Sequence, residues 1–175
     1  LTYSSSTSSD YYFFDLSQEN NSYNFNYTLK KENHIANSIV LPMLGEHNVS
    51  NALAAISVST LLEISHERIF ISLASFKGIK RRFDIHISNK NIVYVDDYAH
   101  HPEEIKSTIA GVLKSFPNRK LKVIFQPHLY SRTKDFANEF AESLSISDEL
   151  ILLDVFPARE EPIYGVDSKM LLDLC

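Results

Sequence analysis

The sequence predicts an α/β protein in which an antiparallel meander with two helices precedes a mostly parallel part. Three observations support this. Short segments with alternating apolar residues occupy residues 11–41. Beyond residue 91, short β-branched runs alternate with segments of helical length, which implies parallel strands and right-handed crossovers. Between the first of these strands and its helix, Asp, Tyr and His crowd into a turn at residues 96–104.

Composition limits the class of protein. The chain has 175 residues, 44% hydrophobic and 22% charged, which fits a soluble globular protein of one domain or one domain and part of another. A net charge of −5 without a Lys/Arg block argues against a nucleic-acid partner, and no apolar stretch approaches the roughly 20 residues of a membrane span. A single cysteine, Cys175, fits a reducing compartment. The lack of an initiator Met and the short final helix predict an excerpt of a longer protein.

The first 41 residues are predicted to form strands. A Ser- and Thr-rich loop at residues 4–9 follows a strand end. The next strand-like segments are separated by Asn, Gln, Glu and Lys, which is typical of an antiparallel meander. These segments are residues 11–16, 24–29 and 34–41.

A helix with an alanine-rich face is predicted from about Val49 to Glu63. Asn48 and Asn51 are three residues apart and share a face of its first turn. An asparagine offers the donor and acceptor that the edge of an adenine ring requires. The spacing alone is also explained by Asn48 as an N-cap and Asn51 as a surface residue. Ser65 is expected to cap a second helix over residues 66–74.

A basic joint follows at residues 76–83, where four cations surround Gly78. It is either a solvated connection or a phosphate clamp, and an arginine is the better clamp because its fork binds two oxygens. The four cations are Lys77, Lys80, Arg81 and Arg82.

The turn after the next hairpin places Asp97, Tyr98 and His100 at the carboxyl end of a strand, where open α/β sheets bind ligands. A carboxylate there suits ribose hydroxyls or a metal, a tyrosine covers a flat ring, and a histidine exchanges protons. Ordinary capping of a helix that starts at Pro102 explains the same residues. A metal hydrolase is a further alternative, and its ligands would be Asp96, Asp97, His100 and His101.

The remaining elements alternate. The continuous apolar run at residues 121–125 predicts a buried strand. The strand ends at Asp97, His128 and Asp154 should line one sheet edge, where His128 and Arg132 together suit a carboxylate although each alone is explained as structural. The other predicted elements are a hairpin of residues 84–88 and 91–95 across residues 89–90, helices at 102–116, 135–144 and from 168, a strand at 149–153 and a loop at 154–165.

Five motifs together resemble the Mur ligases of peptidoglycan synthesis. The most discriminating is Phe-Gln-Pro-His-Leu-Tyr-Ser-Arg-Thr, whereas Asp-Asp-Tyr-Ala-His-His-Pro-Glu-Glu resembles a turn that the alanine-adding and tripeptide-recycling members of the family share. The resemblance implies that residues 1–80 are the C-terminal part of a central ATPase domain with a mixed sheet. Residues 81–175 would be a Rossmann-like, mostly parallel C-terminal domain, incomplete at its end. The five motifs lie at residues 45–55, 76–83, 96–104, 125–133 and 154–163.

The resemblance also implies chemistry. The best-matching member of the family uses ATP with Mg²⁺ to join L-alanine to the lactyl carboxylate of UDP-N-acetylmuramic acid through an acyl phosphate, in the bacterial cytoplasm. A ligase that recycles murein tripeptide and a non-catalytic nucleotide-binding domain are the alternatives. The chain contains no Gly-x-x-Gly-Lys-[Ser/Thr] loop, and the family's magnesium ligands are expected upstream, so these residues alone are expected to be inactive.

Position by position, the resemblance implies that Asn48 and Asn51 meet the adenine. Arg82 would reach the phosphates, Asp97 would bind the ribose, and Tyr98 would lie beside the nucleotide.

For the acceptor side, the resemblance implies that His100, His128 and Arg132 face the alanine and the reacting carboxylate. Two residues depart from the family pattern, which often has glycine at Ala99 and arginine at Leu129. Leu129 removes a cation near the expected carboxylate site.

Overall fold

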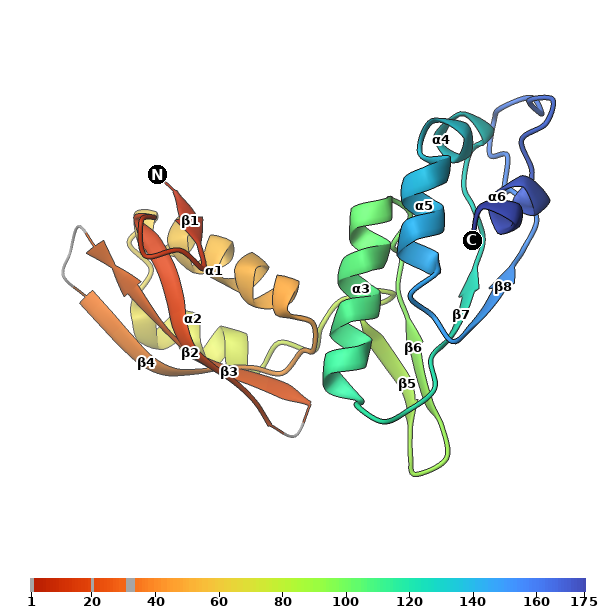
Figure 1. Cartoon of the computed structure of the whole chain (residues 1–175). Coiled ribbons are helices and arrows are strands. Elements are labelled where there is room, and N and C mark those ends of the chain that lie inside the picture. The colour runs from red at the N-terminus through yellow and green to blue at the C-terminus, as the bar shows by residue number, and fades with distance from the viewer. Residues whose placement is uncertain (1, 20, 31–33) are drawn as a thin grey trace. The chain divides into compact units, whose positions relative to one another are not determined.

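The computed structural model describes residues 2–19, 21–30 and 34–175. The chain divides into two compact units, residues 1–96 and 97–175, each described here by itself (Figure 1). Both units combine strands with helices, so the predicted α/β class is confirmed. Within the described residues, none of the helices has the length and apolar character needed to cross a membrane.

The first unit contains a four-stranded sheet in the order β1-β2-β3-β4. Strands β2, β3 and β4 pair antiparallel, which confirms the predicted meander. Strand β1 begins where a strand end was predicted, but its parallel pairing with β2 was not predicted, because the partner lies across the serine-rich loop. The strands are β1 Tyr3–Ser4, β2 Tyr11–Glu19, β3 Ser22–Leu29 and β4 His34–Leu41.

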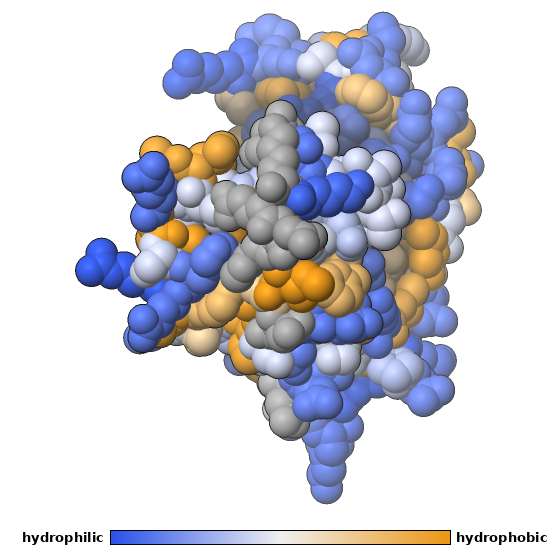
Figure 2. Space-filling model, turned by 90° about the vertical axis from the view of Figure 1, so that its left-hand side faces the viewer, coloured by the Kyte–Doolittle hydropathy of each residue, from blue (hydrophilic) through white to orange (hydrophobic). Residues whose placement is uncertain are grey.

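Helices α1 (Glu46–Leu61) and α2 (His66–Ala74) pack on this sheet. Alternate residues of β3 are buried, as the period of a strand requires, and they share the core with one face of α1. The core side chains are Tyr23, Phe25, Tyr27, Leu29, Val49, Leu53 and Ile56. Figure 2 views the molecule from the left-hand side of Figure 1, and on this face hydrophilic and hydrophobic residues are intermixed.

Helix α1 starts three residues before the predicted Val49, and Gly45 explains this start. Gly45 occupies the N-cap position with φ +87°, a left-handed conformation that favours glycine. A Cβ at this position would lie 2.6 Å from Cε1 of His47. Asn48 is therefore inside the first turn, and its interpretation as the N-cap is wrong.

The predicted hairpin is formed by β5 (Asp84–Ser88) and β6 (Val93–Asp96), which pair antiparallel. Its turn is wider than the expected two residues. The side-chain Oδ1 of Asn89 accepts the backbone N–H groups of Asn91 and Ile92, both at 2.9 Å. Together with the backbone N–H of Asn89, which donates to the carbonyl oxygen of Ile92 at 3.0 Å, these bonds close the turn over residues 89–92.

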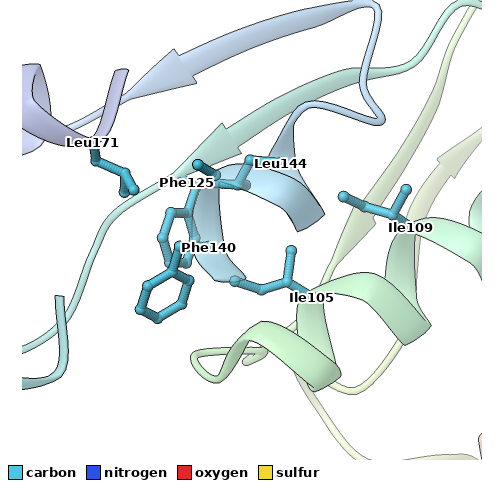
Figure 3. Packing of buried hydrophobic residues seen from close by; sticks show 7 residues of the cluster. Ile105, Ile109, Phe125, Phe140, Leu144 and Leu171 are labelled. Atoms are coloured by element: carbon cyan, nitrogen blue, oxygen red, sulfur yellow. The ribbon is translucent and has the colours of Figure 1, made fainter. Parts of the chain in front are cut away.

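The second unit places α3, α5 and α6 around the parallel pair β7-β8. Figure 3 shows its core, in which side chains from these helices meet Phe125 of β7. The elements are α3 Pro102–Ser115, β7 Lys122–Phe125, α4 Tyr130–Asp135, α5 Ala137–Leu144, β8 Glu149–Leu152 and α6 Ser168–Leu174. The core side chains in Figure 3 are Ile105, Ile109, Phe125, Phe140, Leu144 and Leu171.

Three expectations for this part of the chain are corrected. Strand β7 is not buried throughout, because Ile124 on its outer face is 63% exposed. The helix expected at residues 135–144 is interrupted at Phe136, whose ψ of 24° departs from helical geometry. Among the described strands, β6 bonds to β5 and β7 to β8, so Asp97 does not share a hydrogen-bonded sheet edge with His128.

Candidate active site

The turn after β6 is organised by two carboxylates. Oδ1 of Asp97 accepts the backbone N–H of Ala99 at 2.7 Å, which folds the turn back on itself. Oε2 of Glu104 accepts the backbone N–H groups of His100 at 3.0 Å and His101 at 3.3 Å. With Pro102 as the first helical residue, α3 is capped by Glu104, whereas the capping interpretation gives this role to the Asp-rich turn before Pro102. The two carboxylates thus fix the main chain of the turn.

Tyr98 and His100 present their rings together on this turn. The ring centroids lie 5.2 Å apart in an edge-on arrangement, and Tyr98 is 48% exposed. Nδ1 of His100 lies 2.9 Å from the carbonyl oxygen of Tyr98. Because a carbonyl oxygen only accepts, Nδ1 donates in this bond, and the same nitrogen lies 3.3 Å from Oε2 of Glu104. The turn therefore offers a flat surface for a ring and a proton-exchanging group.

The four residues considered as metal ligands are used separately. Asp96 lies 3.6 Å from Nε of Arg81, and His101 packs edge-on against Phe136 with ring centroids 5.0 Å apart. Throughout residues 2–19, 21–30 and 34–175, no group of three His, Cys, Asp or Glu side chains is arranged to hold a metal. These contacts give Asp96 and His101 partners within the protein.

The second turn continues the pairing of β7 with β8. The backbone N–H of Phe156 donates to Pro127 at 2.8 Å, and the N–H of Leu129 donates to Phe156 at 2.9 Å. Nε2 of Gln126 also donates to the carbonyl oxygen of Asp154 at 3.2 Å. The predicted proximity of the segments that follow these two strands is therefore confirmed for His128 and Asp154.

His128 and Arg132 lie at the two ends of this turn. The His128 ring stacks on Phe156 with centroids 5.5 Å apart, and its Nδ1 is buried without a hydrogen-bond partner among the described residues. In the same described ranges, the partly exposed Arg132 guanidinium forms no ion pair. The guanidinium of Arg132 is a group that suits a carboxylate, whereas Nδ1 of His128 is shielded from solvent.

Leu129 has a backbone role that the sequence did not reveal. It occupies the N-cap of α4 with φ 71°, which is strained for a leucine. Its carbonyl oxygen accepts both the backbone N–H of Thr133 at 3.0 Å and the Thr133 hydroxyl at 2.8 Å. Leu129 thus fixes the direction of the chain as it enters α4. Its side chain also lacks the positive charge expected from the family pattern.

Sequence reasoning missed Glu160. Its carboxylate accepts the Ser131 hydroxyl and, at 2.9 Å, the Ser131 backbone N–H. These bonds, with help from the N–H of Tyr130 and the nearby His128, lower the pKa of Glu160 below its ordinary value. Glu160 and Ser131 are 29 residues apart, so no local spacing signals their contact. The only signal in the sequence was that Ser131 and Glu160 belong to two of the motifs, at residues 125–133 and 154–163.

The first unit holds the other candidates. Asn48 and Asn51 line the same cavity of about 600 Å³ between α1 and α2. Asn48 is only 7% exposed, and its Nδ2 donates to the carbonyl oxygen of Leu44 at 2.7 Å. Asn51 is exposed, with its Nδ2 3.5 Å from Oδ1 of Asn48. Asn48 therefore anchors the helix start, and Asn51 is the more accessible amide.

The four cations of the basic joint have different surroundings. Lys77, Lys80 and Arg82 line a second pocket, of about 450 Å³. Arg81 instead pairs with Asp96 of the hairpin. Three of the four cations therefore line one pocket, which Asp84 lines as well. Ile79 lines both this pocket and the cavity that Asn48 and Asn51 line, so the two hollows are neighbours.

Comparison with known proteins identifies relatives of this chain. The family described as "Mur ligase, glutamate ligase domain" matches residues 81–174. A UDP-N-acetylmuramate–L-alanine ligase of Flavobacterium psychrophilum is 46% identical over 173 residues, which are 99% of this chain and 38% of that protein. The chain thus spans well under half the length of this relative.

Solved structures agree in fold. The UDP-N-acetylmuramate–alanine ligase of Thermotoga maritima matches 97% of this chain and 35% of its own, at 28% identity and a TM-score of 0.76. A murein peptide ligase of Psychrobacter arcticus covers 83% of this chain and 30% of its own, at 30% identity and a TM-score of 0.55.

Proposed function

The chain belongs to the Mur ligase family, and from this premise we propose that the whole protein joins L-alanine to the lactyl carboxylate of UDP-N-acetylmuramic acid with hydrolysis of ATP. The reaction would serve peptidoglycan precursor synthesis in the bacterial cytoplasm. The observation that carries the proposal is the turn that presents His128 and Arg132 beside the loop after β8. The 46% identity to a ligase of this name supports the choice of substrates.

The acceptor chemistry follows from the second unit. Arg132 would hold the carboxylate through its fork, and His128 or His100 would take the proton that the alanine amine loses on attack. ATP would supply the phosphoryl group that turns the carboxylate oxygen into a leaving group, so that amide, ADP and phosphate are the products. The protein would hold the amine of alanine in line with the activated carboxylate and would take up one proton.

The nucleotide groups are spread over both units. Asn51 has the exposed amide that suits an adenine edge, and Arg82 with Lys77 and Lys80 forms the concave cationic pocket that suits phosphates. In the second unit, Asp97 would bind ribose hydroxyls and Tyr98 would cover a ring. The buried, bonded amide of Asn48 supports a smaller share in adenine contact than that of Asn51. Magnesium would accompany ATP, held by residues outside this chain.

The domain boundary is part of the proposal. The family match starts at residue 81, whereas the compact units divide after Asp96. We place the functional boundary at residue 80, so that residues 1–80 complete an ATP-binding domain and residues 81–175 belong to the C-terminal domain.

Amino-acid-dependent phosphate release by the whole protein tests this function, with ATP, Mg²⁺ and UDP-N-acetylmuramic acid present. L-alanine should drive release, whereas L-Ala-γ-D-Glu-meso-diaminopimelate should not. Asp97→Asn keeps an acceptor for the N–H of Ala99 but removes the charge, so it should raise the KM for ATP. The exposed Asp173→Asn is the matched control.

The outcomes separate the alternatives. Release with the tripeptide alone would indicate a recycling ligase, for which the resemblance to the Psychrobacter arcticus enzyme gives a basis. No release with either substrate would favour a non-catalytic nucleotide-binding protein.

A further inference from the structure

We propose that Glu160 is a positioning residue of the ligase site, which holds α4 from the loop after β8 and thereby fixes His128 and Arg132. The inference rests on the proposed function, because it assigns these two side chains to the acceptor side of the reaction. Glu160 itself would contact neither substrate.

The start of α4 needs a partner from elsewhere in the chain. The first N–H groups of a helix have no acceptor inside it, and a Ser, Thr, Asp or Asn at the N-cap usually supplies one. The N-cap of α4 is Leu129, whose side chain has no acceptor. Glu160 takes this function, since its carboxylate binds the N–H and hydroxyl of Ser131 and is also stabilised by the N–H of Tyr130.

Helix α4 is too short to be stable without contacts from the rest of the chain. It has six residues, and helices shorter than about 12 residues are marginal in water without tertiary contacts. Its end breaks at Phe136, and its start carries the strained φ of Leu129. The place of Arg132 is therefore set by what holds the two ends of the helix, and Glu160 holds the first.

The loop that carries Glu160 is itself shaped for this contact. The backbone N–H of Glu160 donates to Pro157 at 2.9 Å across a turn in which Ala158 has φ 53°. Upstream, Phe156 stacks on His128 and bonds to both sides of it through the main chain. The loop thus contacts the turn at two places. The ring of Phe156 packs on His128, which precedes Leu129, and the carboxylate of Glu160 binds Ser131, which follows it.

The adjacent Glu161 provides a matched control. It has the same charge and side chain, is exposed, and makes no contact with Ser131 in the described structure. A change in net charge or loop composition affects both positions alike, so a difference between Glu160→Gln and Glu161→Gln reports the contact with α4. Ser131→Ala and Ser131→Thr test the partner, because threonine keeps the hydroxyl.

The experiment measures steady-state phosphate release by the whole protein as alanine and ATP are varied separately. Hydrogen exchange at the Ser131 amide is measured on the same variants. We expect Glu160→Gln and Ser131→Ala to lower kcat/KM for alanine by about tenfold or more, with the KM for ATP within about twofold of wild type. The Ser131 amide should exchange faster in Glu160→Gln. Glu161→Gln and Ser131→Thr should resemble wild type.

Each other result overturns a distinct statement. An active wild type with an unchanged Glu160→Gln variant would overturn the positioning role and leave the ligase function standing. A rise of the KM for ATP beyond about twofold in Glu160→Gln, or a Glu161→Gln defect as large as that of Glu160→Gln, would show that Glu160 contributes only to general stability and would overturn the inference. An inactive wild type would overturn the ligase function, and the role of Glu160 in it, before any variant is compared.

Discussion

The hydroxyl oxygen of Tyr27 lies 2.8 Å from Nδ1 of His66, so the sheet of the first unit is bonded directly to the first residue of α2. Tyr27 is fully buried in β3. A buried hydroxyl that loses its partner carries a desolvation penalty, so this bond couples the register of the strand to the position of the helix.

Tyr27→Phe should therefore destabilise the chain. Removal of the hydroxyl leaves Nδ1 of His66 without this bond, and we expect the free energy of unfolding to fall by about 1 kcal/mol. A urea titration followed by circular dichroism measures this fall in the free energy of unfolding. The exposed Tyr3→Phe should leave the midpoint unchanged, and equal effects of the two substitutions would contradict the assignment.

Glu104→Ala should destabilise α3 because the carboxylate caps His100 and His101. Loss of a capping interaction costs about 1 kcal/mol. Glu103→Ala is the control, since Glu103 lies in the same first turn and shares the helix-dipole contribution. Thermal unfolding should separate the two variants, and a Glu103→Ala shift as large as that of Glu104→Ala would exclude the cap as the cause.

Leu129→Gly should be more stable than Leu129→Ala. Both lose the side chain, but only glycine adopts φ 71° without strain, so the difference reports the backbone alone. We expect about 1 kcal/mol in favour of glycine, measured by denaturant unfolding. If alanine were the more stable, Leu129 would not be strained.

The stability contributed by Glu160 should depend on pH. Its folded-state pKa is lowered, chiefly by the Ser131 hydroxyl, so the unfolded state binds the proton more tightly. The contribution is present in full above the unfolded pKa and is lost as pH falls through the lower folded pKa. The difference in unfolding free energy between wild type and Glu160→Gln should be constant near neutrality and shrink in acid. A difference that grows in acid would contradict the sign.

Local patterns predicted most of the fold. The bounds of α2 were predicted correctly at residues 66–74, and the meander and the parallel β7-β8 pair were also predicted. Ser65 was expected to cap α2 through its side chain, yet it makes no such hydrogen bond. Periodicity reports which face of a segment is apolar, but it does not report which donor a short polar side chain reaches.

The features that sequence reasoning missed depend on distant partners. β1 pairs across a loop, and Glu160 meets Ser131 from 29 residues away. The local turns were predicted better, since Asp97, Tyr98 and His100 do gather after β6. The roles given to Asn48, Asn51, Arg82, Asp97, Tyr98, His100, His128 and Arg132 stay predictions.

The close approach of His47 to Gly45 has a consequence for how this sequence can diverge. The imidazole occupies the volume in which any other residue at position 45 would place its Cβ. A substitution at Gly45 would be tolerated only after His47 became smaller or turned away, and even then the positive φ would remain a barrier. We therefore expect changes at position 45 to be accompanied by changes at position 47 as this helix start diverges.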